Sequence, residues 1–346
     1  MAAALAEARK GVGHTSPNPA VGAALVIGNR VVARGHHERA GAPHAEMVCL
    51  RRFGRRVPPE ATLYVTLEPC STHGRTPPCT EALIEAGVRR IVIGALDVNP
   101  THNGRALEQL RSAGVSVRAG VLADECRRLN ETFNKWIVSA RPFVIAKCAM
   151  SLDGRLTRPA TESRWMSDAT ARRHVHQLRA TVDAIMIGAE TLRTDNPRLT
   201  VRGLRHRRQP WRIVVTRSGN LPKTARLFTD TAAARTRVYQ GKSLHAVLAE
   251  LGAEAITSVL IEGGGNLLGQ ALEARLIDKV QIYLAPVLTG GGVSAFAALG
   301  AAAATSAARV RDVEYRRVGR TLCVSGYPVY PNAAFRKGET SHATNG

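Results

Sequence analysis

The chain has 346 residues, of which 45% are hydrophobic and 22% are charged, and this balance excludes a globally disordered protein. The length exceeds one ordinary hydrophobic core and predicts two domains of about 150 residues each. Lysine and arginine number 48 against 27 acidic residues, and the net charge of +21 raises the question of nucleic-acid binding. Only seven of the basic residues are lysine, and the arginine doublets lie far apart without interleaved aromatic residues. We therefore interpret the charge as compositional bias and expect no nucleic-acid partner.

Membrane insertion and export are not expected. No stretch approaches the roughly 18 uncharged apolar residues of a spanning helix. The first ten residues carry charge where a signal peptide needs an apolar core, so they predict a short amphipathic helix. Six cysteines are few for this length and unevenly spaced, which argues against a disulfide framework and favours a cytoplasmic protein.

The first part of the chain alternates short β-rich runs with helix-like stretches. Strands are predicted at 23–27, 62–67, 91–94 and 115–118, and helices at 44–52, 79–87 and 104–113. Gly87 and Gly114 stand where glycine commonly ends a helix. Strands that alternate with helices in this way predict a three-layer α/β domain.

A second alternating series begins after Ser139-Ala-Arg-Pro142, which we interpret as a hinge between two domains. Its predicted strands lie at 143–147, 184–187, 212–216, 259–261 and 279–284, and its predicted helices at 168–180, 243–251 and 266–274. The segment from Arg202 to Pro210 is expected to be a basic loop. The predicted domains therefore span residues 1–141 and 142–332, and the polar, aperiodic residues 333–346 predict a disordered tail.

A histidine and two cysteines in the first domain predict a zinc site. His44-Ala45-Glu46 opens a predicted helix, and Glu68-Pro69-Cys70 follows a predicted strand and precedes Cys79. One imidazole and two thiolates suit zinc, and three protein ligands leave the open fourth position of a catalytic site. Zinc in such a site lowers the pKa of bound water to about 7. Glu46 is placed to carry protons between that water and a leaving amine.

Two alternatives accompany this interpretation. A lone His-x-Glu is more often a core histidine, and the two cysteines could be unrelated buried thiols; Pro69-Cys70 and Cys79 together favour zinc. His37 and His73 are alternative ligands. The known deaminase signature has two residues between its cysteines, whereas eight residues separate Cys70 from Cys79 here. We expect the dipole of the predicted helix to keep His44 neutral, as a metal ligand must be.

These residues resemble the deaminase domain of the bifunctional riboflavin-biosynthesis deaminase/reductase family. Pro17-Asn-Pro-Ala-Val-Gly22, His36-His37, Gly41 and Asp97-Val-Asn-Pro100 share the resemblance. It implies a cytidine-deaminase-like fold, zinc held by His44, Cys70 and Cys79, and Glu46 as the proton shuttle. It also implies contacts to a pyrimidine ribotide from Asn18, His37, Arg75, Asp97 and Asn99. The family usually has histidine two residues after the first cysteine, where this chain has Thr72.

The most informative feature of the second domain is Glu262-Gly263-Gly264-Gly265-Asn266, which leads from a predicted strand into a predicted helix. The backbone N–H groups of such a turn can bind phosphate. The turn lacks the G-x-G-x-x-G pattern, so a standard Rossmann domain is not predicted. Taken alone, it fits an ordinary loop leading into a helix equally well, and Gly290-Gly-Gly292 fits a flexible surface turn.

The second series is similar to the reductase domain of the same family, so the resemblance spans roughly residues 1 to 330. It rests on Ser151-Leu-Asp-Gly154, Ser163-Arg-Trp165, Leu178-Arg179, Gly188-Ala-Glu-Thr191 and Asp195-Asn-Pro-Arg-Leu-Thr-Val-Arg202. It implies a dihydrofolate-reductase-like fold that uses NADPH. The implied NADPH contacts are Ala149, Trp165, Thr191, Asp195, Gly264, Gly265, Asn266, Leu267, Leu268, Gly269 and Gln270. The implied ribotide contacts are Lys147, Ser163, Arg179, Leu199, Arg202 and Glu262.

The sequence therefore predicts a two-step enzyme of riboflavin synthesis. The first domain would deaminate 2,5-diamino-6-(ribosylamino)pyrimidin-4-one 5′-phosphate, and the second would reduce the ribosyl group with NADPH to give 5-amino-6-(ribitylamino)uracil 5′-phosphate. One alternative is a deaminase of cytidine or a tRNA base with an inactive reductase-like half. Another is a binding protein with a purely structural zinc, against which Glu46 argues, since a structural site needs no proton shuttle. We expect a homo-oligomer with no membrane partner.

Overall fold

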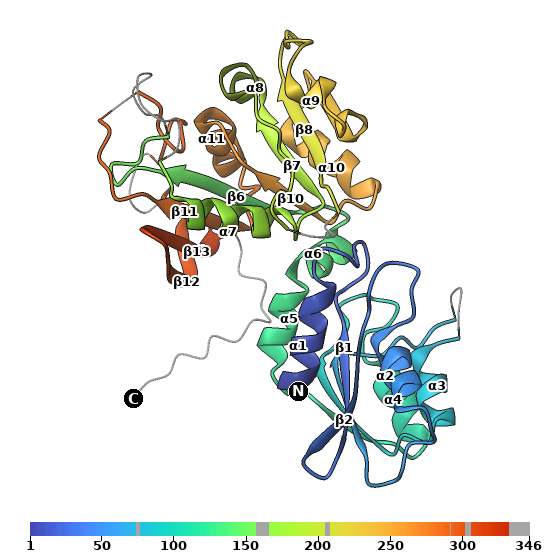
Figure 1. Ribbon diagram of the computed structural model, residues 1–346. Helices are drawn as coiled ribbons and strands as arrows, with labels where there is room; N and C mark the ends of the chain where they lie inside the picture. The colour runs from blue at the N-terminus through green and yellow to red at the C-terminus, as the bar shows by residue number, and fades with distance from the viewer. Residues whose placement is uncertain (74–76, 157–165, 205–207, 291, 302–305, 332–346) are drawn as a thin grey trace. The chain divides into compact units, whose positions relative to one another are not determined.

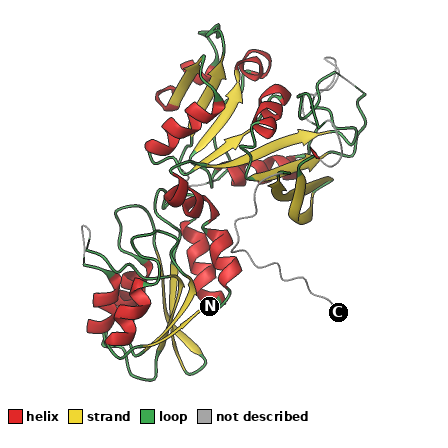
Figure 2. Ribbon diagram, turned by 180° about the vertical axis from the view of Figure 1, so that it is seen from behind, coloured by secondary structure: helices red, strands yellow, loops and turns green. Residues whose placement is uncertain are grey.

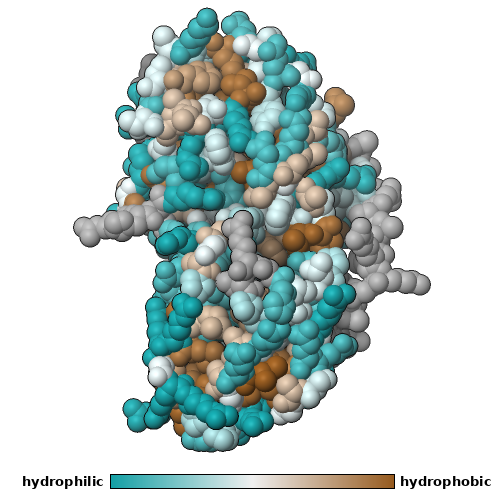
Figure 3. All heavy atoms as spheres, turned by 90° about the vertical axis from the view of Figure 1, so that its right-hand side faces the viewer, coloured by the Kyte–Doolittle hydropathy of each residue, from teal (hydrophilic) through white to brown (hydrophobic). Residues whose placement is uncertain are grey.

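The structure is a computed structural model that describes residues 1–73, 77–156, 166–204, 208–290, 292–301 and 306–331. The predicted tail over 333–346 lies outside the described residues. The contacts within the chain divide it into two compact units, Met1–Phe143 with Arg173–Leu260 and Val144–Arg172 with Ile261–Gly346. None of the helices in the described part of the chain is long and apolar enough to cross a membrane. On the face seen in Figure 3, hydrophilic side chains dominate and apolar ones form small, separate patches.

The first sheet has five strands in the order β2-β1-β3-β4-β5. Their bounds are Gly22–Ile27 for β1, Arg30–His36 for β2, Thr62–Leu67 for β3, Arg90–Ala95 for β4 and Ser116–Ala119 for β5. β1 is antiparallel to both of its neighbours, whereas β3, β4 and β5 are parallel. Because parallel strands end at the same edge of a sheet, the segments that follow β3 and β4 emerge side by side.

Six helices accompany this sheet. They are α1 (Ala2–Gly11), α2 (Ala45–Phe53), α3 (Cys79–Glu85), α4 (Arg105–Ser112), α5 (Ala123–Leu129) and α6 (Glu131–Ser139). Helices α1 and α5 cover one face of the sheet, and α2, α3 and α4 cover the other (Figures 1 and 2). Leu25, Leu63, Leu83, Ile91 and Leu110 belong to the core between the sheet and its helices. The three-layer prediction is confirmed.

The two predicted glycine helix ends are confirmed. Gly87 and Gly114 adopt left-handed φ angles of 83° and 77°. The next residues then turn back onto the helices, because Val88 N–H donates to Leu83 O at 3.1 Å and Val115 N–H donates to Leu110 O at 2.9 Å. These bonds satisfy carbonyl groups that the helix ends would otherwise leave unpaired.

Gly94 of β4 allows α5 to pack closely on the sheet. A Cβ at this position would lie 2.3 Å from Cys126 Sγ and 2.7 Å from Thr66 O. Gly94→Ala is therefore expected to lower the free energy of unfolding by about 1–3 kcal/mol, measured by urea denaturation followed by circular dichroism. Gly292→Ala is the matched control, since its added Cβ meets no atom within 4 Å. Equal urea midpoints for the two variants would contradict this packing.

The second sheet has eight strands in the order β12-β13-β11-β6-β10-β7-β8-β9. The strands are β6 (Phe143–Met150), β7 (Ala184–Gly188), β8 (Trp211–Thr216), β9 (Thr236–Gln240), β10 (Ser258–Ile261), β11 (Lys279–Leu284), β12 (Arg309–Val318) and β13 (Thr321–Val329). β11 is parallel to β6, and β7, β8 and β9 are parallel to one another. β13 is antiparallel to β11 and β12.

Five α-helices belong to this part of the described chain. They are α7 (Ala169–Arg179), α8 (Ala189–Asp195), α9 (Arg226–Thr229), α10 (Leu244–Ala253) and α11 (Gly265–Glu273), and a short 3₁₀ helix spans Ala233–Arg235. The residues predicted to form a hinge lie at the end of α6 and in its connection to β6, where Ala140 is left-handed with φ 53°. The sequence patterns did not predict β2, α5, α6, α8, α9, β9, β12 or β13.

Candidate functional site

The three predicted zinc ligands come from three different elements. His44 is the N-cap of α2, Cys70 lies three residues beyond the end of β3, and Cys79 is the first residue of α3. His44 Nδ1 lies 3.2 Å from Cys79 Sγ and 3.5 Å from Cys70 Sγ. All three ligand atoms lie within 4.8 Å of one another, and no second group of this kind occurs among the described residues. One imidazole and two sulfur atoms at this spacing fit a zinc ion.

The two sulfur atoms are electrostatically unequal. Hydrogen bonds from Cys79 and His44 lower the pKa of Cys70 to about 4, whereas the same bond to Cys70, together with burial, raises the pKa of Cys79. The backbone N–H of Cys79 also donates to Cys70 Sγ at 3.2 Å. The hydrogen bond to Cys70 raises the pKa of His44, which acts against the neutral ring expected from the helix dipole. A metal that binds these groups must displace their protons.

Glu46 lies in the first turn of α2 with only 3% of its surface exposed. Burial raises the pKa of its carboxyl group, and the nearby His44 opposes that shift. A carboxyl group whose pKa is raised towards neutrality is suited to take up and release a proton during a reaction. Neither alternative histidine joins the ligand group: His73 Nε2 lies 3.4 Å from Glu81 Oε2, and His37 hydrogen-bonds elsewhere.

His37 and Asn18 lie beside the predicted zinc ligands. The rings of His37 and His44 meet edge to face with their centroids 5.4 Å apart. His37 Nδ1 lies 3.1 Å from Pro43 O, an acceptor, so this nitrogen carries the proton. His37 Nε2 then accepts from Asn18 Nδ2 at 3.1 Å. Burial lowers the pKa of His37, which agrees with a neutral ring.

Asp97 and Asn99 lie in the loop that follows β4. Asp97 Oδ1 accepts from Asn99 N–H at 2.9 Å, and Asn99 Oδ1 accepts from Thr101 N–H at 3.2 Å. Burial raises the pKa of Asp97, and the negative charge of Cys70 adds to the shift. Asp97 is therefore close enough to the ligand group to feel its charge. The predicted contacts Arg75, Ser163 and Trp165 lie outside the described residues.

Gln109 of α4 was not predicted to matter for the site. Its Nε2 donates to Ser71 O at 3.3 Å, and its Oε1 accepts from Thr80 Oγ1 at 3.0 Å. Ser71 and Thr80 directly follow Cys70 and Cys79, so a single amide connects both ligand segments. A lone glutamine on a short polar helix carries no sequence signal of this role.

Among the predicted reductase residues, Lys147 on β6 and Glu262 directly after β10 lie together. Lys147 Nζ is 3.9 Å from Glu262 Oε2, and the two side chains are 13% and 6% exposed. Lys147 Nζ also lies 6.0 Å from the centroid of the Tyr283 ring, whose hydroxyl accepts from Gln281 Nε2 at 2.9 Å. Ala149 occurs two residues after Lys147 and is paired with Tyr283 across β6 and β11. The side chains of Lys147, Glu262, Tyr283 and Gln281 therefore form one polar cluster on or directly after neighbouring strands.

The predicted NADPH segment 264–270 is a turn and the first part of helix α11. Gly263 has φ 120°, which favours glycine, and Gly264 is the N-cap of the helix. A Cβ at Gly265 would lie 2.1 Å from Ser294 O. Leu267, Leu268 and Gly269 are also buried, so the side chains of this segment that face solvent are those of Asn266 and Gln270. Free N–H groups at the start of a helix suit a phosphate group.

The remaining predicted reductase residues lie in the segments before and after β7. Thr191 and Asp195 lie on α8, and Arg179 ends α7. Arg179 Nη1 donates to Thr200 O at 3.2 Å, and Arg202 Nη1 donates to Thr200 Oγ1 at 3.0 Å. The two arginines therefore converge on Thr200, which was not predicted. Paired guanidinium groups suit a phosphate group because each planar fork can bind two oxygens.

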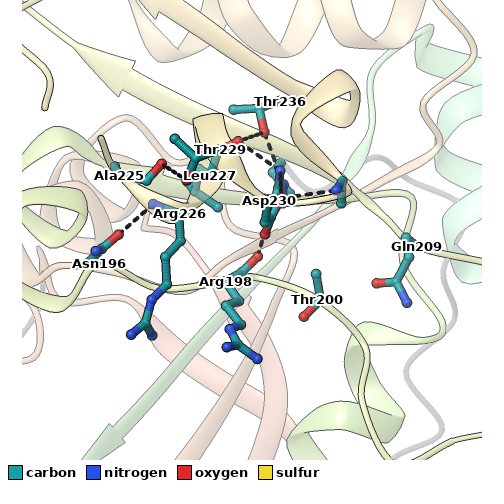
Figure 4. A network of polar contacts seen from close by, with 12 residues as sticks. Asn196, Arg198, Thr200, Gln209, Ala225, Arg226, Leu227, Thr229, Asp230 and Thr236 are labelled. Atoms are coloured by element: carbon teal, nitrogen blue, oxygen red, sulfur yellow. Dashed lines mark hydrogen bonds and ion pairs between the residues drawn. The ribbon is translucent and has the colours of Figure 1, made fainter. Parts of the chain in front are cut away.

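The segment between Asn196 and Arg202 is held at several points (Figure 4). Arg226 N–H donates to Asn196 Oδ1 at 2.8 Å, and Arg212 Nη1 donates to Arg198 O at 3.1 Å. Leu199 between them is buried and left-handed with φ 49°. Because Leu199 is only 2% exposed, it offers very little surface to a ligand.

Two protein-family models match the chain. The cytidine and deoxycytidylate deaminase zinc-binding region matches residues 1–95, and the RibD C-terminal domain matches residues 142–324. The riboflavin biosynthesis protein RibD of Synechocystis is 38% identical, with 92% of this chain and 93% of that protein covered. The Escherichia coli RibD is 37% identical, with 94% and 97% covered.

Solved structures agree with these relatives. RibD of Acinetobacter baumannii superimposes with a TM-score of 0.86 at 33% identity, covering 94% of this chain and 97% of that one. A Thermotoga maritima protein superimposes with a TM-score of 0.85 at 35% identity and the same coverage. It is described as a diaminohydroxyphosphoribosylaminopyrimidine deaminase/5-amino-6-(5-phosphoribosylamino)uracil reductase. The chain therefore belongs to the RibD family of riboflavin biosynthesis, which joins a zinc-binding deaminase domain to an NADPH-dependent reductase domain.

Proposed function

We propose that this chain deaminates 2,5-diamino-6-(ribosylamino)pyrimidin-4-one 5′-phosphate and then reduces the ribosyl group, giving 5-amino-6-(ribitylamino)uracil 5′-phosphate. The observation that carries the proposal is the group of His44, Cys70 and Cys79 with the buried carboxyl group of Glu46 in the adjoining helix turn. The description of the Thermotoga maritima relative supports the same pair of reactions.

The proposed domains span residues 1–141 for deamination and 142–332 for reduction, with 333–346 as a tail. The ranges of the two family models support this division, since one ends at residue 95 and the other begins at residue 142. The connection between α6 and β6 falls at the proposed boundary. We further propose a cytoplasmic homo-oligomer, whose mass light scattering of the purified protein would measure.

For deamination, we propose that His44, Cys70 and Cys79 hold zinc and that Asn18, His37, Arg75, Asp97 and Asn99 bind the ribotide. When bound, zinc would supply a water of lowered pKa for attack on the ring carbon. Glu46 would accept a proton at its carboxylate and return a proton to the departing amine. The new bond joins carbon to oxygen, the carbon–nitrogen bond breaks, and ammonia leaves.

For reduction, we propose that NADPH contacts Ala149, Trp165, Thr191, Asp195 and residues 264–270. NADPH supplies the hydride, so the task of the protein is to bind and orient the two reactants. Arg179 and Arg202 would bind the phosphate near Thr200, and Lys147 and Glu262 would orient the ribosyl group. Ser163 and Leu199 complete the proposed ribotide contacts.

The direct test supplies the purified protein with the diaminopyrimidine ribotide, with and without NADPH. Ammonia should be released in both cases, and NADPH should be oxidised only after deamination has begun. A preference for cytidine or a tRNA substrate would favour the alternative deaminase. That alternative also predicts a steep loss of affinity with salt, because a tRNA binds through many phosphate contacts.

Removal of zinc provides a separate prediction. Treatment with a zinc chelator is expected to reduce ammonia release about 100-fold or more, since the acidified water is lost. Reduction of the ribotide that has already been deaminated should keep its rate, and added zinc should restore ammonia release. If chelation instead unfolds residues 1–141 and Glu46→Gln leaves ammonia release unchanged, the metal has a purely structural role.

A further inference from the structure

Glu68 is a buried carboxylate whose bonding is completed entirely by backbone donors. It is the first residue after β3, lies two residues before Cys70, and is 4% exposed. Its Oε2 accepts from Asp97 N–H at 3.1 Å and from Gly104 N–H at 3.0 Å, and its Oε1 accepts from Ala106 N–H at 3.1 Å. Three such bonds compensate for the burial of the side chain.

The three donors lie at the two ends of one loop. Asp97 is the second residue after β4, whereas Gly104 and Ala106 lie at the start of α4. The carboxylate of Glu68 therefore ties the beginning of the loop to its end. Inside the loop, Asn99 O accepts from His102 N–H at 2.9 Å, so the segment carrying Asn99 is itself a tight turn.

Helix α4 is also fixed at a second point. One turn beyond Ala106, the amide of Gln109 bonds Ser71 O and Thr80 Oγ1, next to the two cysteine ligands. Glu68 is itself joined to β4, because its N–H donates to Ala95 O at 2.9 Å. The loop, the helix and the strand end leading to Cys70 thus form one hydrogen-bonded frame.

We propose that Glu68 is a positioning residue for deamination: it fixes Asp97 and Asn99 relative to Cys70 without touching the ribotide. The inference rests on the proposed function, because Asp97 and Asn99 are proposed ribotide contacts. A group that supports a reactive site in this way acts on substrate binding through the residues that it holds.

Glu68→Gln tests this role. Its amide has a single acceptor oxygen, so its NH₂ group must face at least one of the three backbone N–H donors. We expect the KM of the ribotide in ammonia release to rise about 10- to 100-fold, with a smaller change in kcat. Zinc content and the reduction of deaminated ribotide should stay as in the wild type. Glu108→Gln, which alters an exposed carboxylate on the same helix, is the matched control and should leave KM unchanged.

A double-mutant cycle separates positioning from a general effect on the fold. If Glu68 acts through the loop, Glu68→Gln added to Asn99→Ala should raise KM much less than it does alone. Additive effects, an unchanged KM, or loss of zinc with KM unchanged would each overturn the inference. Glu68→Asp retains the charge but withdraws it by one methylene, so it should raise KM even if Glu68→Gln does not accumulate. If the wild type itself releases no ammonia from the ribotide, the proposed function fails first and this inference with it.

Discussion

Glu46→Gln is expected to lower the rate of ammonia release about 100- to 10,000-fold, the range typical of a lost general acid–base group. Reduction of ribotide that has already been deaminated should continue at the wild-type rate. The substitution keeps the size of the side chain, which matters because Glu46 is 3% exposed within α2. Its amide cannot take a proton from water or give one to the leaving amine.

The pH profile gives the same prediction a second readout. Burial raises the pKa of Glu46, whereas the positive charge of bound zinc would lower it. In either case the carboxylate needed as a base is lost when Glu46 is protonated. The wild-type rate should therefore fall on the acidic side of the pH profile, whereas the residual rate of Glu46→Gln should not show this fall.

Metal analysis and a second glutamine variant provide the controls. Glu46→Gln should retain zinc, because the residue is not one of the three grouped ligands. Glu81→Gln alters a half-exposed carboxylate on α3 that faces His73 and should leave the rate nearly unchanged. Full ammonia release by Glu46→Gln would remove the proposed proton shuttle.

Arg212→Met is expected to lower the free energy of unfolding by about 3–5 kcal/mol, because it leaves the half-buried Asp230 carboxylate and the carbonyl groups of Arg198 and Leu227 without their buried cation. Arg212 on β8 is 1% exposed, and each of its donor atoms has a partner: Nε donates to Thr236 Oγ1, Nη1 to Arg198 O and Nη2 to Leu227 O. Its Nη1 and Nη2 pair with Asp230 Oδ2 and Oδ1 at 2.8 and 2.9 Å. Urea denaturation would measure the loss.

The pH dependence of the free energy of unfolding distinguishes the charge interaction between Arg212 and Asp230 from the packing of the Arg212 side chain. The hydrogen bonds from Arg212 hold the pKa of Asp230 below its ordinary value. A carboxyl group with a lowered folded-state pKa stabilises the fold above its unfolded pKa, and that contribution is lost as pH falls through the folded value. The difference between wild type and Arg212→Met should therefore shrink below about pH 4.

An exposed ion pair is the matched control. Lys242 Nζ lies 2.5 Å from Glu250 Oε1, and both side chains are nearly half exposed. Lys242→Met should change the free energy of unfolding by about 1 kcal/mol or less. A similar loss of free energy in Lys242→Met and Arg212→Met would show that the network around Arg212 adds no more stability than an exposed ion pair.

Sequence patterns predicted the elements whose side chains are buried and regularly spaced. β3 and β11 begin and end where expected, because short apolar runs with β-branched residues identify them. Hairpin β12–β13 escaped prediction because β12 is arginine-rich and mostly exposed, and its register shifts between Arg311 and Glu314. Helix α8 escaped because seven residues are too few to establish a helical period.

The site residues also fall into two groups, those that the sequence predicted and those that it did not. His44, Cys70 and Cys79 were predictable because metal ligands are chemically distinctive and their spacing is characteristic. Glu68 and Gln109 were not, because their roles depend on backbone and side-chain partners about 30 residues away. Arg212 was one arginine among many, and only its pairing with Asp230 separates it from the rest.

The arginine-rich strand β12 has a further consequence. It is the outermost strand of the second sheet, so one row of its N–H and C=O groups lacks a partner strand within that sheet. The strand carries four arginines, Arg309, Arg311, Arg316 and Arg317, against Asp312 and Glu314, so this edge has a net positive charge, and its pairing with β13 shifts register between Arg311 and Glu314. Repulsion between two such edges hinders the strand pairing that begins aggregation. Part of the excess positive charge is therefore expected to hinder association through this edge of the sheet.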